Sequence, residues 1–362
     1  MNRLLHMIDS VFQDNIITNR RQIISQSKLQ IGDATFSSTK RILGWDLDTS
    51  TMNLHLPPAR LQQLQTLLEA TLCKRRTSKC KYQQLLGTLR SSAPSLYGAN
   101  NLFLSLQYAL RECTKNRVKI TPLVRQMLHD WILLATEANK CPVPLHTADP
   151  RAPHLLGATN AYKFGMGGCW TAMTIDGHTS NYLWCTPFPS IIQENLVSSH
   201  NPTGSITNSD LELAAIIQGS TFMALLGHTP YAHILLASDN IPTVSWVAKG
   251  STMSTGPAAY LLHLLAQRRR QTPYTLTPVY TPGNTNTIAD CCSRFFSLTD
   301  SQFGQKMNAA FPVQPSWKLV HPPHDMTSSV ILALSRKLRP LASTPLNEAQ
   351  ETQSGTFGTP SV

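Results

Sequence analysis

A buried central strand is predicted by residues 233–240, which read HILLASDN. From His233 to Ala237 the run is almost entirely apolar, which is typical of a strand covered on both faces. Asp239 follows directly, at the carboxyl end of that strand. We therefore expect an acidic side chain where the strand leaves the sheet, and carboxylate oxygens are the ligands that Mg²⁺ prefers.

The residues around this strand predict an α/β domain in the order β-β-β-α-β-α-α-β-α. Apolar stretches bounded by turn residues favour four further strands at 154–159, 164–173, 181–186 and 274–280. Apolar residues at helical spacing favour helices at 209–226, 242–248, 257–270 and 288–296. Within the second strand segment, the glycines of 164–168 are expected to form a hairpin turn with positive φ rather than a phosphate-binding loop.

Two more acidic residues stand at the start of predicted helices. Glu212 lies in the first turn of helix 209–226, and Asp290 lies in the first turn of the last helix. Each of the three acids has a structural alternative: Glu212 in a capping box with Ser209, Asp239 with Asn240 at a helix N-cap, and Asp290 in a box with Thr287. Taken together and in this order, the three acids favour one convergent site for divalent metal ions.

The charge of the chain is concentrated in its first part. The formal net charge is +11, and residues 1–150 hold 19 of the 31 basic and 10 of the 20 acidic side chains. This distribution favours nucleic acid as a partner over charge that serves solubility alone. The densest basic cluster comprises Lys74, Arg75, Arg76, Lys79 and Lys81. It is expected to contact a phosphate backbone, whereas a solvated helix end is the alternative.

A second basic run, Arg268, Arg269 and Arg270, ends helix 257–270. It either contacts phosphates or complements the helix dipole, and the sequence leaves both open.

No uninterrupted apolar run approaches the roughly 20 residues that a membrane span needs. Asp9 and Asp14 fall where a secretory signal would need an apolar core. The 8 cysteines form no C-x-x-C pair. We therefore expect an intracellular protein with reduced thiols and no membrane partner, in either the nucleus or the cytoplasm.

Four stretches carry a resemblance to a known family: TNAYKFGMGGCW (159–170), TNSDLELAA (207–215), ASDNIPTVSWVAKGST (237–252) and TPGNTNTIADCCSR (281–294). In this order they resemble the RNase H domain of retrotransposon reverse transcriptases of the long-terminal-repeat and DIRS-like kind. Upstream, HMIDSVFQDN (6–15) is similar to the palm hairpin of these enzymes, residues 40–64 to the palm-to-thumb junction, and residues 83–110 to the thumb and connection.

The resemblance implies a division of the chain and an RNase H-like fold with a mixed five-stranded sheet. The expected segments are a truncated palm remnant (1–56), a helical thumb/connection module (57–140), a Pro-rich linker (141–150), the RNase H-like domain (151–300), a C-terminal extension (301–339) and a disordered tail (340–362).

The resemblance also implies the chemistry of the site. Glu212, Asp239 and Asp290 match the family's metal-binding acids, which hold Mg²⁺ or Mn²⁺ and hydrolyse the RNA strand of RNA–DNA hybrids. The first acid of the family is replaced by Asn160. An amide removes one negative charge from the site, so hydrolysis is expected to be impaired. Asp9 is followed by serine where the palm carries paired acids, and no polymerase activity is expected.

Three classes of function therefore remain. The chain is an RNase H-type endoribonuclease, a non-catalytic relic that binds nucleic acid, or a structural subunit of a larger reverse-transcriptase complex. The last would involve association with itself or with other retroelement products, for which the sequence contains no motif.

Overall fold

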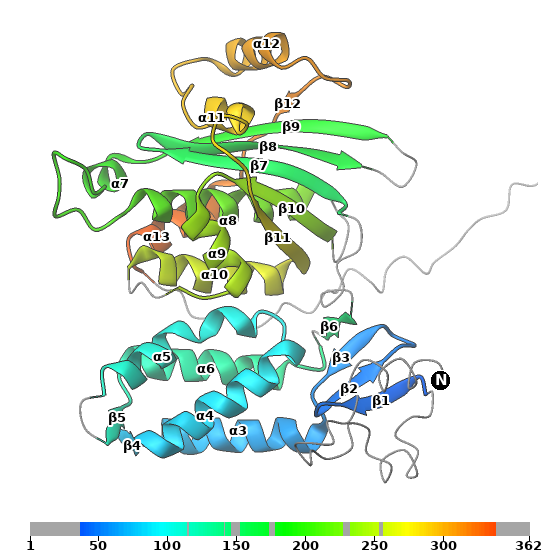
Figure 1. The fold of residues 1–362 in the computed structure, drawn as a ribbon, viewed down its shortest axis with the longest axis vertical. Coiled ribbons are helices and arrows are strands. Elements are labelled where there is room, and N and C mark those ends of the chain that lie inside the picture. Colours follow the sequence, from blue (N-terminus) through cyan, green and yellow to red (C-terminus); the bar gives the residue numbers. More distant parts are fainter. Residues whose placement is uncertain are drawn as a thin grey trace, which may run out of the picture.

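The computed structural model describes residues 37–113, 116–140, 142–145, 153–173, 178–226, 232–252 and 256–337. The predictions for Asp9 and for the tail at 340–362 lie outside these residues. In Figure 1 a large sheet with its helices lies above a helical module, and a small sheet flanks that module. Within the described residues, no helix is long and apolar enough to cross a membrane.

The small sheet contains four short antiparallel strands in the order β1-β2-β3-β6. They are β1 (Thr39–Ile42), β2 (Trp45–Asp48), β3 (Asn53–His55) and β6 (Val143–Pro144). The turn between β1 and β2 consists of Leu43 and Gly44, both with positive φ, as a tight hairpin of this twist requires. Because β6 lies inside the predicted linker, part of residues 141–150 is a strand that pairs with β3.

The helical module is built from four α-helices, two short 3₁₀ turns and a two-stranded ribbon. The helices are α3 (Pro58–Leu72), α4 (Lys79–Ser92), α5 (Leu104–Arg111) and α6 (Pro122–Thr136). The turns η1 (Ala93–Ser95) and η2 (Ala99–Leu102) connect α4 to α5, and the ribbon pairs β4 (Arg76–Ser78) with β5 (Arg117–Lys119). The module has its own core around Leu64, Leu68, Tyr82 and Trp131, and the helical prediction for residues 57–140 holds apart from the ribbon.

The large sheet is mixed and has the order β11-β10-β7-β8-β9-β12. Its strands are β7 (Leu155–Tyr162), β8 (Gly165–Met173), β9 (Thr179–Pro187), β10 (Ala232–Ser238), β11 (Tyr274–Tyr280) and β12 (Lys318–Leu319). The first three strands form an antiparallel meander, and β10 runs parallel to both β7 and β11. The five predicted strands are present, and the segment after residue 300 adds a sixth, β12, beside β9.

Helices cover both faces of this sheet (Figure 1). One face carries α8 (Asn208–Leu226), α9 (Ile241–Lys249), α10 (Pro257–Gln271) and α13 (His324–Leu334), and the other carries α11 (Thr287–Cys292) and α12 (Asp300–Ala310). A short helix, α7 (Ser190–Glu194), follows β9.

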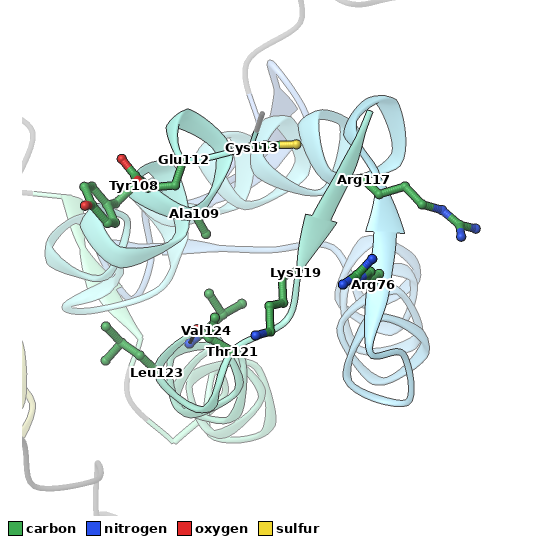
Figure 2. Close-up of a pocket in the computed structure, with 10 residues that line it drawn as sticks. All are labelled: Arg76, Tyr108, Ala109, Glu112, Cys113, Arg117, Lys119, Thr121, Leu123 and Val124. Atoms are coloured by element: carbon green, nitrogen blue, oxygen red, sulfur yellow. Dashed lines mark hydrogen bonds between the residues drawn. The ribbon is translucent and has the colours of Figure 1, made fainter. Parts of the chain in front are cut away.

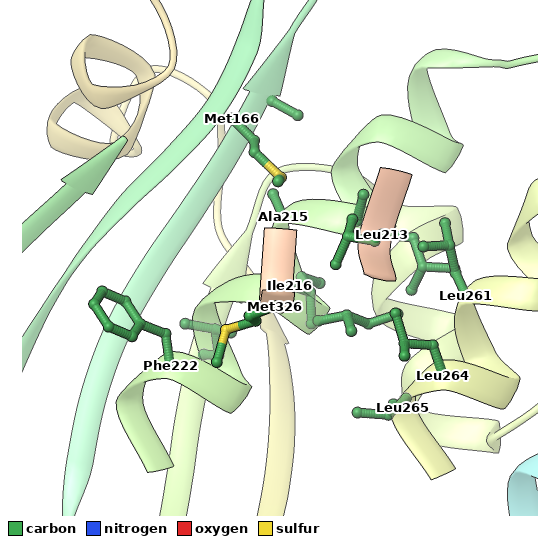
Figure 3. Close-up of a cluster of buried hydrophobic side chains, with 14 of the residues drawn as sticks. Met166, Leu213, Ala215, Ile216, Phe222, Leu261, Leu264, Leu265 and Met326 are labelled. Carbon is green, nitrogen blue, oxygen red and sulfur yellow. The ribbon is translucent and has the colours of Figure 1, made fainter. Parts of the chain in front are cut away.

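The central helix α8 is buried along most of its length. Residues 210–224 are all buried, because α8 packs against β7 on one side and against α10 and α13 on the other. Figure 3 shows Met166, Phe222 and Leu261 among the side chains of this core.

The glycines of β8 let α11 lie directly on the sheet. A Cβ atom at Gly167 would lie 2.5 Å from the backbone of Cys292 in α11, and one at Gly168 would lie 2.4 Å from the carbonyl oxygen of Ala158. The turn of the β7–β8 hairpin is formed by Lys163 and Phe164, because Tyr162 pairs with Gly165. Positive φ was predicted for the glycines of 164–168 and is wrong, since none of them has it. Gly165, Gly167 and Gly168 are strand glycines that allow close approach.

The two modules meet through α10. Ala266 belongs to the core of the helical module, and the hydroxyl of Tyr97 donates to the backbone oxygen of Tyr274 at 2.7 Å. Arg270 is buried and forms an ion pair with the buried Glu137. Arg270 therefore serves the contact between modules, which corrects the prediction that it contacts nucleic acid.

Candidate functional site

The residues predicted to form one site come from four elements. Asn160 lies near the end of β7, Glu212 in the second turn of α8, Asp239 directly after β10, and Asp290 in α11. Because β7 and β10 are adjacent and parallel, their carboxyl ends meet at the same edge of the sheet. Asp239 and Asp290 both raise the pKa of Glu212, which indicates that the acids lie within electrostatic reach of one another.

The capping alternatives are decided by the observed hydrogen bonds, and at the start of α8 the box is made by other residues. The carboxylate of Asp210 accepts from the backbone N–H of Thr207 at 2.8 Å, and the hydroxyl of Thr207 accepts from the N–H of Asp210 at 3.3 Å. At α9 the cap is Asn240, which accepts from the N–H of Thr243 at 3.1 Å. Neither Glu212 nor Asp239 is therefore used to cap one of these helices.

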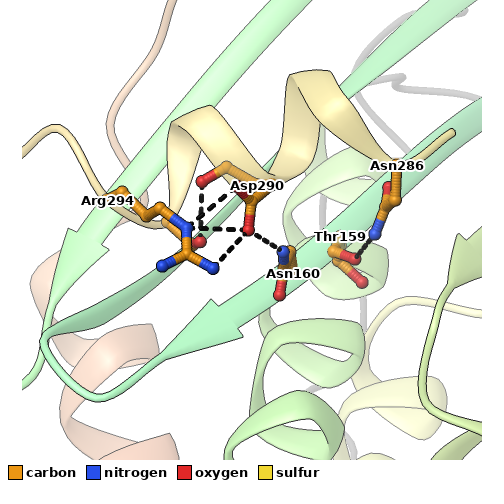
Figure 4. A network of polar contacts seen from close by, with 6 residues as sticks. Thr159, Asn160, Asn286, Asp290 and Arg294 are labelled. Carbon is orange, nitrogen blue, oxygen red and sulfur yellow. Dashed lines mark hydrogen bonds and ion pairs between the residues drawn. The ribbon is translucent and has the colours of Figure 1, made fainter. Parts of the chain in front are cut away.

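At α11 the N-cap is Asn286, and its side chain makes no capping hydrogen bond. The side-chain amide of Asn286 instead donates to the backbone oxygen of Thr159 at 3.0 Å and ties the start of the helix to β7 (Figure 4). The carboxylate of Asp290 is bonded to other groups, so the predicted box with Thr287 is not formed.

Glu212 is a buried carboxyl group with one unsatisfied oxygen. Glu212 is 2% exposed, and its Oε2 has no hydrogen-bond partner among the described residues. Burial raises the pKa of Glu212 to about 8, and the carboxylates of Asp239 and Asp290 add to the rise. Hydrogen bonds from the backbone of Ala161 and the hydroxyl of Ser238 lower that pKa only in part. Without a cation nearby, Glu212 is therefore protonated at neutral pH.

Asp290 is held by two nitrogen donors. The amide of Asn160 donates to its Oδ1 at 2.8 Å, and Nε of Arg294 lies 2.8 Å from both carboxylate oxygens (Figure 4). The guanidinium of Arg294 also lies over the ring of Tyr162, 4.2 Å from its centroid. A cationic side chain thus binds the acid that the resemblance assigns to a metal ion.

Arg294 was not among the predicted site residues. The sequence did contain a signal for it, because an arginine four residues after an acid on a helix favours an ion pair.

Asp239 faces the loop that leads into α11. A Cβ atom at Gly283 would lie 2.9 Å from Oδ2 of Asp239, so this loop passes close to the carboxylate. Tyr280 pairs in register with Ser238 and is exposed.

The donor set does not fit a pair of divalent ions. Among the described residues, no group of three or more His, Cys, Asp or Glu side chains lies close enough to hold a metal ion. Both oxygens of Asp290 accept from Arg294, and Asn160 presents an N–H group where a ligand needs an oxygen. Of the side chains predicted to hold Mg²⁺ or Mn²⁺, Asp290 is thus engaged by Asn160 and Arg294, whereas Oε2 of Glu212 has no hydrogen-bond partner among the described residues.

The predicted nucleic-acid contacts differ in their exposure. Lys74, Arg75, Arg76, Lys79 and Lys81 are all exposed. Helix α3 ends at Leu72 and has no basic residue in its last turn, so this cluster does not complement its dipole. In the second basic run, Arg269 donates to the backbone oxygen of Tyr274 at 3.2 Å, and Arg268 lies 3.4 Å from Oε1 of Gln271.

No protein-family model matches the chain, and no curated protein matches it. Three solved structures align with 68% of it. They are foamy viral protease-reverse transcriptase dRH with double-stranded DNA (TM-score 0.30, 11% identity), the same kind of protein with an RNA/DNA hybrid (0.28, 12%), and with double-stranded DNA (0.30, 13%). The chain spans 38%, 29% and 46% of their lengths. Likenesses this weak assign neither fold nor function.

Proposed function

We propose that residues 151–300 are an RNase H-like domain of a retroelement reverse transcriptase, and that this chain binds nucleic acid through its basic helical module without cutting it. The observation that carries this proposal is the network of Asn160, Asp290 and Arg294, in which an amide and a guanidinium engage the acid expected to bind metal. The RNase H-like assignment is supported by the strand order β11-β10-β7-β8-β9 and by the acids on α8, β10 and α11.

Hydrolysis of a phosphodiester by two metal ions needs carboxylates that hold the ions about 3.5–4 Å apart. Asn160 supplies no charge, and Asp290 is paired with Arg294. Glu212 is protonated at neutral pH, since its pKa is raised to about 8.

Nucleic-acid binding is supported by the basic helical module. Its exposed cluster, Lys74 to Lys81, includes Arg76 of strand β4 and residues on both sides of that strand. Exposed cations of this kind contact a phosphate backbone without reading bases. Binding of this kind weakens as salt rises. Cleavage would depend on the site at the sheet edge in the other module, so binding and cleavage can be measured separately.

One observation favours the alternative, a weak metal-dependent endoribonuclease. Oε2 of Glu212 is buried and unpaired among the described residues, and a cation beside it would satisfy that oxygen. No contact among the described residues supports a structural role within a larger reverse-transcriptase complex. No polymerase activity is proposed.

The test is cleavage of a labelled RNA–DNA hybrid with Mg²⁺ or Mn²⁺. We expect the native chain to bind the hybrid and leave it intact, and the double variant Asn160→Asp/Arg294→Gln to acquire metal-dependent cleavage. Adding Asp239→Asn to the double variant is the matched control and should abolish the acquired activity. Cleavage by the native chain at the rate of the double variant would overturn the proposal.

A further inference from the structure

The ribbon of the helical module carries cations on one face. Arg76 of β4 pairs in register with Lys119 of β5, and Arg117 lies two residues before Lys119. Because strand side chains alternate, these three cations share one face, and all three are exposed. Thr77 and Val118 on the opposite face are buried.

Beside this face lies a groove of about 580 Å³, between the ribbon and helices α5 and α6. In Figure 2, Arg76 and Lys119 lie at one end of the groove and Tyr108 and Leu123 at the other. Tyr108 is 37% exposed and Leu123 is 40% exposed, although both are side chains that a core would normally cover. The guanidinium of Arg111 lies 5.7 Å from the centroid of the Tyr108 ring.

We propose that this groove binds one nucleotide, with its phosphate at Arg76 and Lys119 and its base against Tyr108 and Leu123. The volume lies within the range of small-ligand sites, about 300–1,000 Å³. Cations at one end and an exposed aromatic ring at the other match a phosphate joined to a planar base, since bases stack on aromatic side chains without regard to sequence. The carboxylate of Glu112, which also lines the groove, offers an acceptor for the amino group of a base.

This inference deepens the nucleic-acid binding proposed for the helical module, with which it shares Arg76, and it adds the requirement of an unstacked base, which Tyr108→Ala tests separately. A duplex holds its bases stacked on one another and leaves no base face free to stack on Tyr108. The nucleotide belongs either to a single strand or to a free nucleoside phosphate, and the two sources share the same recognition chemistry. Nucleotide binding in this groove does not depend on whether Asp290 binds a metal ion.

The test measures binding of three probes to the full chain at about 0.1 M salt: a fluorescent deoxythymidine 10-mer, a fluorescent nucleoside triphosphate and a 20-base-pair DNA duplex. The charge variant is Arg76→Gln/Lys119→Gln, and its control is Lys249→Gln/Lys318→Gln, which removes two exposed cations from the other module. The stacking variant is Tyr108→Ala, and Tyr108→Phe is its matched control because it keeps the ring. Thermal unfolding of each variant verifies that it is folded.

We expect Arg76→Gln/Lys119→Gln and Tyr108→Ala each to weaken the 10-mer by at least about fivefold, while both controls stay near the native value. The same loss for the triphosphate would support the groove with a free nucleotide as its ligand. The inference is overturned if the native chain binds neither the 10-mer nor the triphosphate, or if Tyr108→Ala leaves the binding of both unchanged. It is also overturned if the control pair weakens the 10-mer as much as the groove pair, since the effect would then be net charge alone.

Discussion

Asp290 accepts hydrogen bonds from an amide and a guanidinium, and this single arrangement sets the charge of the site. Asn160 donates at 2.8 Å, and Arg294 forms an ion pair with the carboxylate at 2.8 Å. In a cluster of four acids, mutual repulsion favours either bound cations or protons. Here an amide replaces one acid and an arginine neutralises another, so the network is stable without a divalent ion.

The raised pKa of Glu212 predicts a pH dependence of stability. The folded state holds a proton up to about pH 8, whereas the unfolded chain releases it near the ordinary value of 4.5. The free energy of unfolding should therefore fall between about pH 4.5 and 8, by at most about 1.4 kcal/mol per pH unit, and stay level above that range. Glu212→Gln should lack this component of the fall.

Urea unfolding of the native chain and Glu212→Gln in EDTA, at pH 5, 6.5 and 8, measures the difference. The variant should gain stability relative to the native chain as pH rises. Parallel curves for the two proteins would contradict the buried, protonated state of Glu212.

The sequence singled out Asn160, Glu212, Asp239 and Asp290 as candidate site residues but could not decide their contacts. Glu212, Asp239 and Asp290 were found from their positions before and after predicted elements. Whether each capped a helix depended on neighbours, because Asp210 and Asn240 compete for the same backbone groups and make the caps. The spacing of Arg294 from Asp290 was visible in the sequence, but the contribution of Asn160 to the same carboxylate depends on how α11 lies on β7.

At the scale of elements, the path of β8 depends on glycines that allow a helix to approach. Cys292 of α11 and Cys169 of β8 belong to the core on this side of the sheet. A Cβ atom at Gly167 would lie 2.5 Å from the Cys292 backbone, which is closer than backbone can accommodate without moving α11. Asp290 lies on that same helix, so its position relies on these glycines.

Gly167→Ala should therefore destabilise the chain by about 2–4 kcal/mol through overpacking. The matched control is Gly87→Ala on the exposed surface of α4, where a Cβ atom meets nothing within 4 Å. That substitution should raise stability by up to about 1 kcal/mol, because alanine favours a helix. Thermal unfolding of both variants measures the two effects, and equal stability of Gly167→Ala and the native chain would contradict the close packing of α11.

Long elements were predictable and very short ones were not. Strand 274–280 was predicted at its observed bounds, and helices α8, α9 and α10 were predicted to within one residue at each end. Strands β4, β5, β6 and β12 are two or three residues long, which is too short for an alternating pattern. Their pairing comes from partners distant in the sequence, such as β3 for β6.

At the scale of the whole molecule, α10 joins the two modules through buried polar contacts. Arg270 and Glu137 form an ion pair with side chains 4% and 7% exposed, and His263 lies 3.6 Å from Asp130. Removing one partner of such a pair leaves a buried charge without its counter-ion, which costs more than the pair contributes when intact. These contacts could not be predicted, since Arg270 reads in the sequence as one of three similar arginines at a helix end.

Glu137→Gln should destabilise the chain by about 2–4 kcal/mol. The double variant Glu137→Leu/Arg270→Met should recover most of that loss, because apolar side chains of similar size fill the same space without desolvating a charge. Chemical denaturation monitored by tryptophan fluorescence measures both. If Glu137→Gln unfolds at the native midpoint, the ion pair does not hold the modules together.

The central claim, that the network of Asn160, Asp290 and Arg294 replaces bound metal, is tested most directly by calorimetric titration of Mn²⁺ into the native chain and into Asn160→Asp/Arg294→Gln. The native chain should show no stoichiometric binding at millimolar Mn²⁺, and the double variant should bind the ion because two negative charges are restored or released. Stoichiometric binding by the native chain that is lost on Asp239→Asn would contradict the claim.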